Sequence, residues 1–327
     1  MPETSSALGT RGNTLPPAIA FAQTLARSRV SLLLFLIAAT ALAFSAAMPQ
    51  FISQANLINL LRQSSVLAIV GCGTTFVIVA GEIDLSVGSL VAFVAVLTAW
   101  LSDRSVSIEN ILVLGLLAGI LAGTINSILV LVLGVPSFLA TLGTQAIVRG
   151  AAMTLSLQPL PLRNISFIKF FGWSPAGAPM PVVIAVLLSI LSILMFTRAR
   201  FGIRTRAVGS NEGAARLAGL ATKRQKYAVL VLGSVMAAIA GIVLAGRTNY
   251  GMSQAGTGLE LDAIAATLLG GGRLGGGVGS VLGTLLAAIL LTIIFTGIAT
   301  LGLSGSFQDI AKGLLVGVAI FLMRAPG

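Results

Sequence analysis

The sequence of 327 residues contains no histidine and only one cysteine, Cys72. A single cysteine excludes a disulfide framework within the chain. The absence of histidine removes the commonest metal ligand and general base, so a metalloenzyme and a Ser/His hydrolase are ruled out and no metal site is predicted. No Gly-Lys-Ser or Gly-Lys-Thr triplet occurs, so the chain lacks a Walker motif and any ATP hydrolysis must come from another subunit.

Charged residues are also scarce. They make up 9% of the chain, against about 25% in soluble domains, while hydrophobic residues make up 56%. This composition predicts an integral membrane protein surrounded by a lipid bilayer. The net charge of +11 could suggest nucleic-acid binding, but with so few charges it is better explained by Lys and Arg retained in cytoplasmic loops, and we expect no nucleic-acid partner.

Long apolar runs dominate the chain. A helix that crosses a bilayer core of about 30 Å needs roughly 20 apolar residues. Ten runs suit such helices, so the predicted fold class is all-α, a polytopic membrane protein with about ten transmembrane helices. Two runs are weaker, because one contains Arg149 and another, 261–271, is too short to span in full. The ten runs are 30–48, 65–80, 85–101, 111–135, 137–157, 180–196, 227–245, 261–271, 278–301 and 310–323.

Residues 1–29 are polar and are predicted to form a cytoplasmic tail, with residues 30–327 as the transmembrane domain. A cleaved signal peptide is the alternative, since residues 45–47 are small enough for a cleavage site, but the apolar run is longer than the usual length of about 7–15 residues. With ten crossings, both termini lie in the cytoplasm. Thirteen basic residues then fall in cytoplasmic segments and five in exterior ones, in agreement with the positive-inside rule.

A weak internal repeat aligns residues 82–90 with residues 260–268, matching small with small and apolar with apolar residues. The two segments open the third and eighth predicted helices, and an offset of five crossings inverts the orientation. We therefore predict two five-helix halves of inverted topology. Chance similarity between apolar segments is the alternative.

Four acids lie at the start of the two repeated segments, namely Glu82, Asp84, Glu260 and Asp262. Charges near or within the membrane are costly and usually functional. We therefore predict that these acids, together with Ser86, line a translocation path. Asp84 and Asp262 would also be good N-caps for the helices that follow, so a purely structural role is the alternative.

Glycine is concentrated at two places that matter for packing. Gly115, Gly119 and Gly123 are spaced to allow tight packing of the fourth predicted helix. Residues 270–277 contain six glycines, cannot hold a stable helix, and predict either a hinge or a close approach of two backbones.

The most informative segment lies between the sixth and seventh predicted helices, at residues 198–226. It contains eight basic residues and one acid, Glu212. Within it, residues 208–220 predict a short helix, with Ser210 or Asn211 as N-cap, Glu212 in the first turn and Gly219 as the stop.

The face of this short helix indicates a binding role. Alanines at 214, 215 and 218 would leave a shallow surface between Leu217 and Leu220. Such a helix is suited to docking in a groove of a soluble partner. A helix that lies on anionic lipid is the alternative.

Five segments occur in an order that is familiar from one family. They are residues 81–89 (GEIDLSVGS), 138–143 (FLATLG), 200–204 (RFGIR), 209–219 (GSNEGAARLAG) and 256–266 (GTGLELDAIAA), the last followed by the glycine cluster. Together these motifs, which span most of residues 60–320, resemble the permease subunits of ribose-type ABC importers.

The resemblance implies a bacterial inner-membrane complex of two permease subunits, identical or different, with two cytoplasmic ATPase subunits and a periplasmic sugar-binding protein. ATP and Mg would be bound by the ATPase, and this chain would hold no cofactor and would not be an enzyme. The segment 209–219 would be the coupling helix that inserts into the ATPase. The residues that match it are Gly209, Ser210, Asn211, Glu212, Ala214, Ala215, Arg216, Leu217 and Gly219.

The coupling segment departs from the general importer pattern at two points. Gly213 replaces the first alanine, and Gly219 lies seven rather than six residues after Glu212. This spacing resembles the sugar-permease branch and leaves the docking contacts open.

The function expected from the resemblance is translocation of a monosaccharide such as ribose or xylose, driven by the separate ATPase. An ion-driven secondary transporter is one alternative, since inverted repeats and membrane acids would suit it. An ABC permease for autoinducer-2, a nucleoside or a branched-chain amino acid is another. An intramembrane enzyme acting on lipid would need clustered catalytic groups, and with no histidine and nine acids the sequence offers none.

Overall fold

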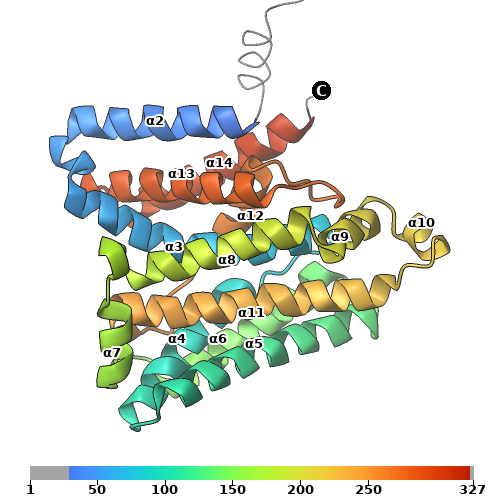
Figure 1. Cartoon of the computed structure of the whole chain (residues 1–327), viewed down its shortest axis with the longest axis horizontal. Coiled ribbons are helices and arrows are strands. Elements are labelled where there is room, and N and C mark those ends of the chain that lie inside the picture. The colour runs from blue at the N-terminus through green and yellow to red at the C-terminus, as the bar shows by residue number, and fades with distance from the viewer. Residues whose placement is uncertain (1–28, 325–327) are drawn as a thin grey trace, which may run out of the picture.

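The computed structural model describes residues 29–324, which form a bundle of helices. Most long helices run side by side, α7 lies across one end, and α9 and α10 project from the other, which we call the α10 end (Figure 1). The helices are α2 (Arg29–Ala47), α3 (Gln54–Val79), α4 (Val87–Asp103), α5 (Ile108–Leu131), α6 (Ser137–Leu155), α7 (Ile165–Gly172), α8 (Met180–Thr197), α9 (Arg200–Ser210), α10 (Glu212–Leu217), α11 (Thr222–Thr248), α12 (Leu259–Leu269), α13 (Val281–Thr300) and α14 (Gly305–Arg324).

The prediction of a mainly helical membrane protein is confirmed. Among the described residues, each of the ten predicted runs is occupied by a helix, and six helices are long and apolar enough to cross a membrane: α2, α3, α5, α8, α11 and α13. The count of ten crossings stays a prediction, because α4, α6, α12 and α14 are not among these six, and α4 and α12 have only 17 and 11 residues. Apart from Arg29, the predicted tail 1–29 lies outside the described residues.

Two helices extend well beyond their apolar runs. α3 begins at Gln54, where the Ser53 hydroxyl accepts a hydrogen bond of 3.4 Å from the Asn56 amide. α11 begins at Thr222, so that Lys226 belongs to this helix. Hydropathy marks only the apolar part of a helix and misses polar turns that continue it. The predicted loop 198–226 is therefore composed largely of α9, α10 and the start of α11.

Short 3-10 helices and strands close the bundle at the α7 end. The 3-10 helices η1 (Pro49–Ile52) and η2 (Pro175–Gly177) precede α3 and α8. Strand β1 (Leu160–Pro161) pairs antiparallel with β2 (Tyr250–Gly251), with Leu160 opposite Gly251. This pairing joins the connection after α6 to the connection after α11.

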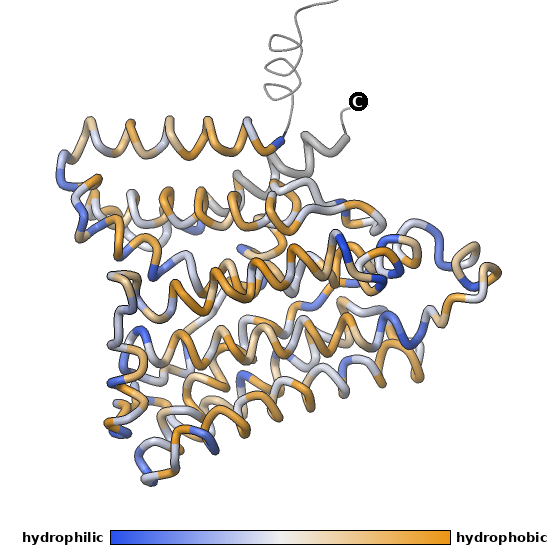
Figure 2. Tube along the Cα trace, viewed as in Figure 1, coloured by the Kyte–Doolittle hydropathy of each residue, from blue (hydrophilic) through white to orange (hydrophobic). Residues whose placement is uncertain are grey.

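The core of the bundle is built around α11, which packs against α3, α4 and α5. Hydrophobic residues run along these helices, while hydrophilic residues gather at their ends and around α9 and α10 (Figure 2). The predicted role of the α5 glycines is confirmed. A Cβ at Gly119 would lie 2.7 Å from the Ala238 Cβ, and one at Gly123 would lie 2.6 Å from the Val231 Cα. The two helices therefore approach each other at backbone distance.

The two repeated segments meet inside the bundle. A Cβ at Gly88 in α4 would lie 2.5 Å from the Gly256 carbonyl oxygen, just before α12, and a Cβ at Gly256 would lie 2.6 Å from the Gly88 carbonyl oxygen. The N-terminal ends of α4 and α12 are thus in backbone contact. The prediction of two five-helix halves of inverted topology stays a prediction.

The contact between α5 and α11 predicts the effect of a small substitution. Gly123→Ala adds a methyl group against the α11 backbone, and overpacking of this kind costs about 1–3 kcal/mol. We expect this variant to lower the thermal unfolding midpoint of the detergent-solubilised chain. Gly143→Ala on α6 is the matched control, because a Cβ there meets nothing within 4 Å. Equal midpoints for the two variants would contradict the backbone contact.

Candidate functional site

An ion-pair network lies at the α10 end of the bundle. The Lys226 ammonium nitrogen lies 2.7 Å from Glu82 Oε1 and 2.7 Å from Glu212 Oε2. The Arg216 guanidinium lies 3.5 Å from Glu212 Oε1, one turn along α10. One lysine of α11 therefore joins the predicted coupling segment to Glu82, which was predicted for the translocation path and is 7% exposed.

The same contacts set the protonation state of Glu212. The hydrogen bond from Lys226 holds the pKa of Glu212 below its usual range; its partial burial opposes this shift, and the positive charges of Lys226 and Arg216 add to it. The carboxylate is therefore ionised at neutral pH. Because a low pKa in the folded state means that the ionised form is stabilised, this contribution to stability is lost as the pH falls through that lowered pKa.

The short helix α10 is capped by Asn211. Its Oδ1 atom accepts a hydrogen bond of 2.9 Å from the Ala214 amide, whereas Ser210 is the last residue of α9. Of the two predicted N-caps, Asn211 is therefore correct. The predicted stop is also confirmed, since Gly219 follows the helix with a φ of +82°.

The surface of α10 differs in one respect from the prediction. Ala215 is buried, with 6% of its surface exposed, so it packs inward and cannot belong to a shallow outer surface. The outer face is formed by Ala214, Arg216, Leu217 and Ala218. Leu217 is 92% exposed, more than any other large apolar side chain among the described residues.

The glycine cluster packs against the same end of the bundle. The Gly277 amide donates a hydrogen bond of 2.8 Å to the carbonyl oxygen of Val79, the last residue of α3. A Cβ at Gly209 would clash with that same oxygen. Gly276 and Gly277 have φ values of +81° and +76°, which favour glycine. Of the two predicted roles for the cluster, the structure shows the close backbone approach.

Asp84 stabilises the turn before α4 and does not act as its N-cap. Its Oδ1 atom accepts hydrogen bonds from the Ser86 amide (2.8 Å) and the Ser86 hydroxyl (2.6 Å). The Ser86 hydroxyl oxygen in turn accepts from Asn126 Nδ2 at 2.9 Å. Asp84 is 3% exposed and Asn126 is fully buried. The N-cap prediction for Asp84 is wrong because the helix begins only at Val87, with Ser86 at the cap position.

The non-helical backbone around Asp84 is satisfied by α6. The Ile83 amide donates to the Ser137 hydroxyl oxygen at 3.1 Å, and the Leu85 amide donates to the Thr141 hydroxyl oxygen at 3.0 Å. Backbone groups inside an apolar bundle require such internal partners. The segment 82–86 is thereby fixed to the first turns of α6.

Glu260 lies at the contact between the N-terminal ends of α4 and α12. It is 8% exposed, and its Oε2 atom would meet a Cβ at Gly88. On the other side, Gln145 Nε2 donates to Glu260 Oε1 at 3.1 Å. Arg149, one turn further along α6, donates to the Ser253 and Ala255 carbonyl oxygens at 2.6 and 2.9 Å. Two polar residues of α6 therefore hold α12 and the connection that precedes it.

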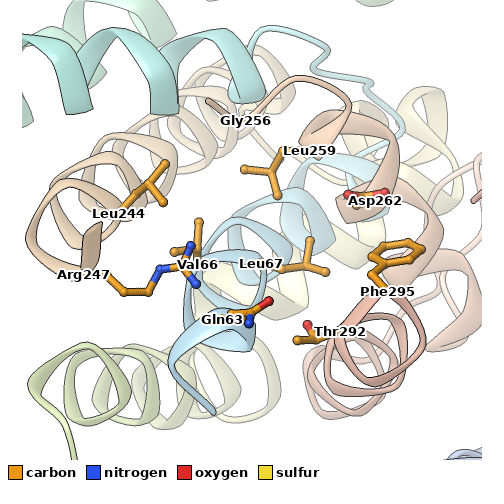
Figure 3. Close-up of a pocket in the computed structure, with 10 residues that line it drawn as sticks. All are labelled: Gln63, Val66, Leu67, Leu244, Arg247, Gly256, Leu259, Asp262, Thr292 and Phe295. Carbon is orange, nitrogen blue, oxygen red and sulfur yellow. The ribbon is translucent and has the colours of Figure 1, made fainter. Parts of the chain in front are cut away.

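Asp262 is not an N-cap either. α12 begins three residues earlier, at Leu259, because Gly258 with a φ of +80° supplies the turn into the helix. Asp262 instead lines a cavity of about 210 Å³ between α3, α11, α12 and α13. Figure 3 shows Asp262 and Arg247 on opposite sides of this cavity, with the other polar groups on its wall, Gln63 and Thr292.

Sequence reasoning missed three residues of this cavity. Gln63 lies just before the apolar run 65–80 and Arg247 just after the run 227–245, so both fall outside the ranges predicted as helices. Thr292 gave no signal within its apolar helix. A charged residue that directly follows a long apolar run is a signal that could have pointed to Arg247.

The structure thus divides the predicted path residues among three places. Glu82 lies at the α10 end, in the network of Lys226. Asp84, Ser86 and Glu260 lie near the meeting point of α4 and α12. Asp262 lies on the cavity.

Comparison with known proteins gives consistent matches over most of the chain. The family described as "Branched-chain amino acid transport system / permease component" matches residues 56–323. The chain is 38% identical over 289 residues to the probable ABC transporter permease protein YphD of Escherichia coli (strain K12), covering 88% of this chain and 87% of that protein.

Two further relatives have a sugar in their names. The ribose import permease protein RbsC of Bacillus subtilis (strain 168) is 34% identical over 280 residues, covering 84% of this chain and 87% of that protein. The galactofuranose transporter permease protein YtfT of Escherichia coli (strain K12) is 36% identical over 261 residues, covering 79% and 76%. No solved structure matches the chain.

The contacts of Arg149 predict a stability effect. Arg149→Met leaves two carbonyl oxygens without their donor, and a buried acceptor without a partner costs about 1–3 kcal/mol. We expect a lower unfolding midpoint in detergent. Arg163→Met is the matched control, because Arg163 pairs with Asp103 at an exposed site, where an ion pair contributes about 0–1 kcal/mol. An Arg149→Met variant as stable as this control would refute the positioning of the 253–255 connection by Arg149.

Proposed function

Because the chain belongs to the sugar ABC transporter permease family, as a non-catalytic, multi-pass subunit of the inner membrane, we propose that it translocates a monosaccharide such as ribose or xylose. The observation that carries this proposal is the match to a ribose import permease over 84% of the chain. The alternative solute is a branched-chain amino acid, which the description of the matched family names.

The family implies an ATPase and a solute-binding protein as partners. In our proposal, α10 docks into a groove of the ATPase with Leu217 at the centre of the contact. An apolar side chain that is 92% exposed on a projecting helix is suited to such a groove. The α10 end then faces the cytoplasm together with both termini, residues 1–29 form a cytoplasmic tail, and ATP and Mg bind to the ATPase while this chain holds no cofactor.

The proposed translocation path follows the buried acids. Among the described residues, Asp84 Oδ2 and Glu260 Oε2 are buried oxygens with no hydrogen-bond partner. Such groups are costly in an apolar interior and need an explanation. Acceptor oxygens near the meeting point of α4 and α12, with Asp262 on the adjoining cavity, could accept hydrogen bonds from sugar hydroxyls. A second permease copy, identical or related, would complete the pathway.

The mechanism that fits this arrangement is alternating access. ATP binding would bring the two ATPases together, the docked α10 helices would follow, and the two permease subunits would rearrange around the path. Nucleotide can shift this equilibrium only through its different affinity for the two states. The permease contributes binding surfaces and movement, and it makes and breaks no covalent bond.

Uptake in proteoliposomes tests the proposed function directly. The chain is reconstituted with its ATPase and binding protein, and entry of labelled ribose, xylose and leucine is measured with and without ATP. We expect ATP-dependent entry of a pentose that an uncoupler of ion gradients does not abolish. Leucine entry would assign the alternative solute, and entry that needs no ATP but collapses with the uncoupler would indicate an ion-driven transporter.

The docking of α10 predicts a variant that loses the ATPase while the fold of the chain is kept. Leu217→Asp places a charge at the centre of the proposed contact, so we expect the ATPase to be lost when the tagged chain is purified from mild detergent. The fold should be unchanged, since the side chain is exposed. Leu157→Asp is the matched control, because Leu157 is 75% exposed just after α6, away from α10. Retention of the ATPase by Leu217→Asp, as by the control, would contradict the docking site.

A further inference from the structure

Lys226 joins two parts of the chain that have different proposed tasks. Glu212 begins α10, the helix proposed to bind the ATPase, and Glu82 begins the segment that leads into α4. We propose that Lys226 is a positioning residue that transmits movement of α10 to the start of α4. This inference rests on the proposed function of α10 and adds the route by which its movement reaches the membrane-embedded helices.

The geometry of the bridge is that of a firm connection. Both distances are 2.7 Å, and the side chains of Lys226 and Glu82 are 14% and 9% exposed. Removal of one partner from a pair shielded in this way leaves an uncompensated charge, which is strongly unfavourable. The three side chains are therefore held together, and movement of α10 away from Lys226 breaks the 2.7 Å contact between Lys226 and Glu212.

Glu82 is connected to α3, α4 and α6, so a displacement of Glu82 by α10 would reach these helices. Its amide donates a hydrogen bond of 3.0 Å to the Val77 carbonyl oxygen, which anchors it to the end of α3. The residues that follow are bound by Ser137 and Thr141 of α6 and by the turn at Asp84. Since α4 begins at Val87, a displacement of Glu82 reaches α4 and α6 within five residues.

The neighbouring helix α9 offers no comparable freedom. Its C-terminal end lies in backbone contact with α3 and the glycine cluster, because Gly209 has no room for a Cβ beside the Val79 carbonyl oxygen. The side chains of the Lys226 bridge can change rotamer while their charges stay paired. The backbone contact at Gly209 allows no comparable movement of α9. The Lys226 bridge is therefore the adjustable connection between α10 and the segment before α4.

The test compares two lysines of the same helix in the complete complex. Lys226→Met removes the bridge, and Lys223→Met changes an exposed lysine nearly one turn earlier in α11. Each variant is co-purified with the ATPase, reconstituted with the binding protein, and assayed for both solute uptake and ATP hydrolysis. For Lys226→Met we expect the ATPase to be retained and the solute transported per ATP to fall about tenfold, which lies within the usual range of coupling between two sites. Lys223→Met should match the unmodified chain.

Two further variants separate transmission from a loss of folding. Glu82→Gln keeps the size of the side chain and the pairing of Lys226 with Glu212, and we expect it to lower the same ratio. Lys226→Arg, which can still contact both carboxylates, should keep the solute transported per ATP close to that of the unmodified chain. A purely structural role would reduce the yield of folded complex while leaving the ratio unchanged in the molecules that remain.

The results distinguish failure of the proposed transmission by Lys226 from failure of the proposed function of α10. A ratio for Lys226→Met equal to that of Lys223→Met overturns the proposed transmission, and so does loss of the ATPase from Lys226→Met, since Lys226 would then only set the docking of α10. Absence of any ATPase from the unmodified chain would overturn the proposed function of α10 itself.

Discussion

Backbone groups that leave a helix inside an apolar bundle must find their hydrogen-bond partners within the protein. This requirement explains where the few polar residues of the chain lie. Ser137 and Thr141 satisfy the segment before α4, and Arg149 satisfies the connection before α12. Two acids of the repeated segments, Asp84 and Glu260, lie beside the same two interruptions. Polar chemistry is therefore concentrated where helices break, and these breaks meet at Gly88 and Gly256 in the middle of the bundle.

Features with a local signal could be predicted from the sequence. Apolar runs located the long helices, the spacing of Gly119 and Gly123 predicted a tight contact, and Gly219 marked the end of α10. Each of these depends on a few neighbouring residues and on their intrinsic preferences. The family motifs added the segment 209–219 as a candidate for coupling, and the structure shows that its outer face is accessible.

Features that depend on distant residues could not be predicted in this way. Nothing in the neighbourhood of Glu82 indicates that Lys226 would be its partner, because the two are brought together only by the packing of α3 against α11. Asp262 looked like a cap because hydropathy starts α12 too late, and the helix that includes it turns the side chain toward a cavity. The inward orientation of Ala215 depends likewise on how α10 packs against α9 and α11.

The partnership of Glu82 and Lys226 also has a consequence for biosynthesis. Lys226 is translated 144 residues after Glu82 (226 − 82). At a synthesis rate of about 5–20 residues per second, the first half of the protein waits roughly 7–30 s before that partner exists. During this interval the carboxylate of Glu82 has no Lys226 to pair with. The order of translation thus places this contact between the two halves of the chain late in synthesis.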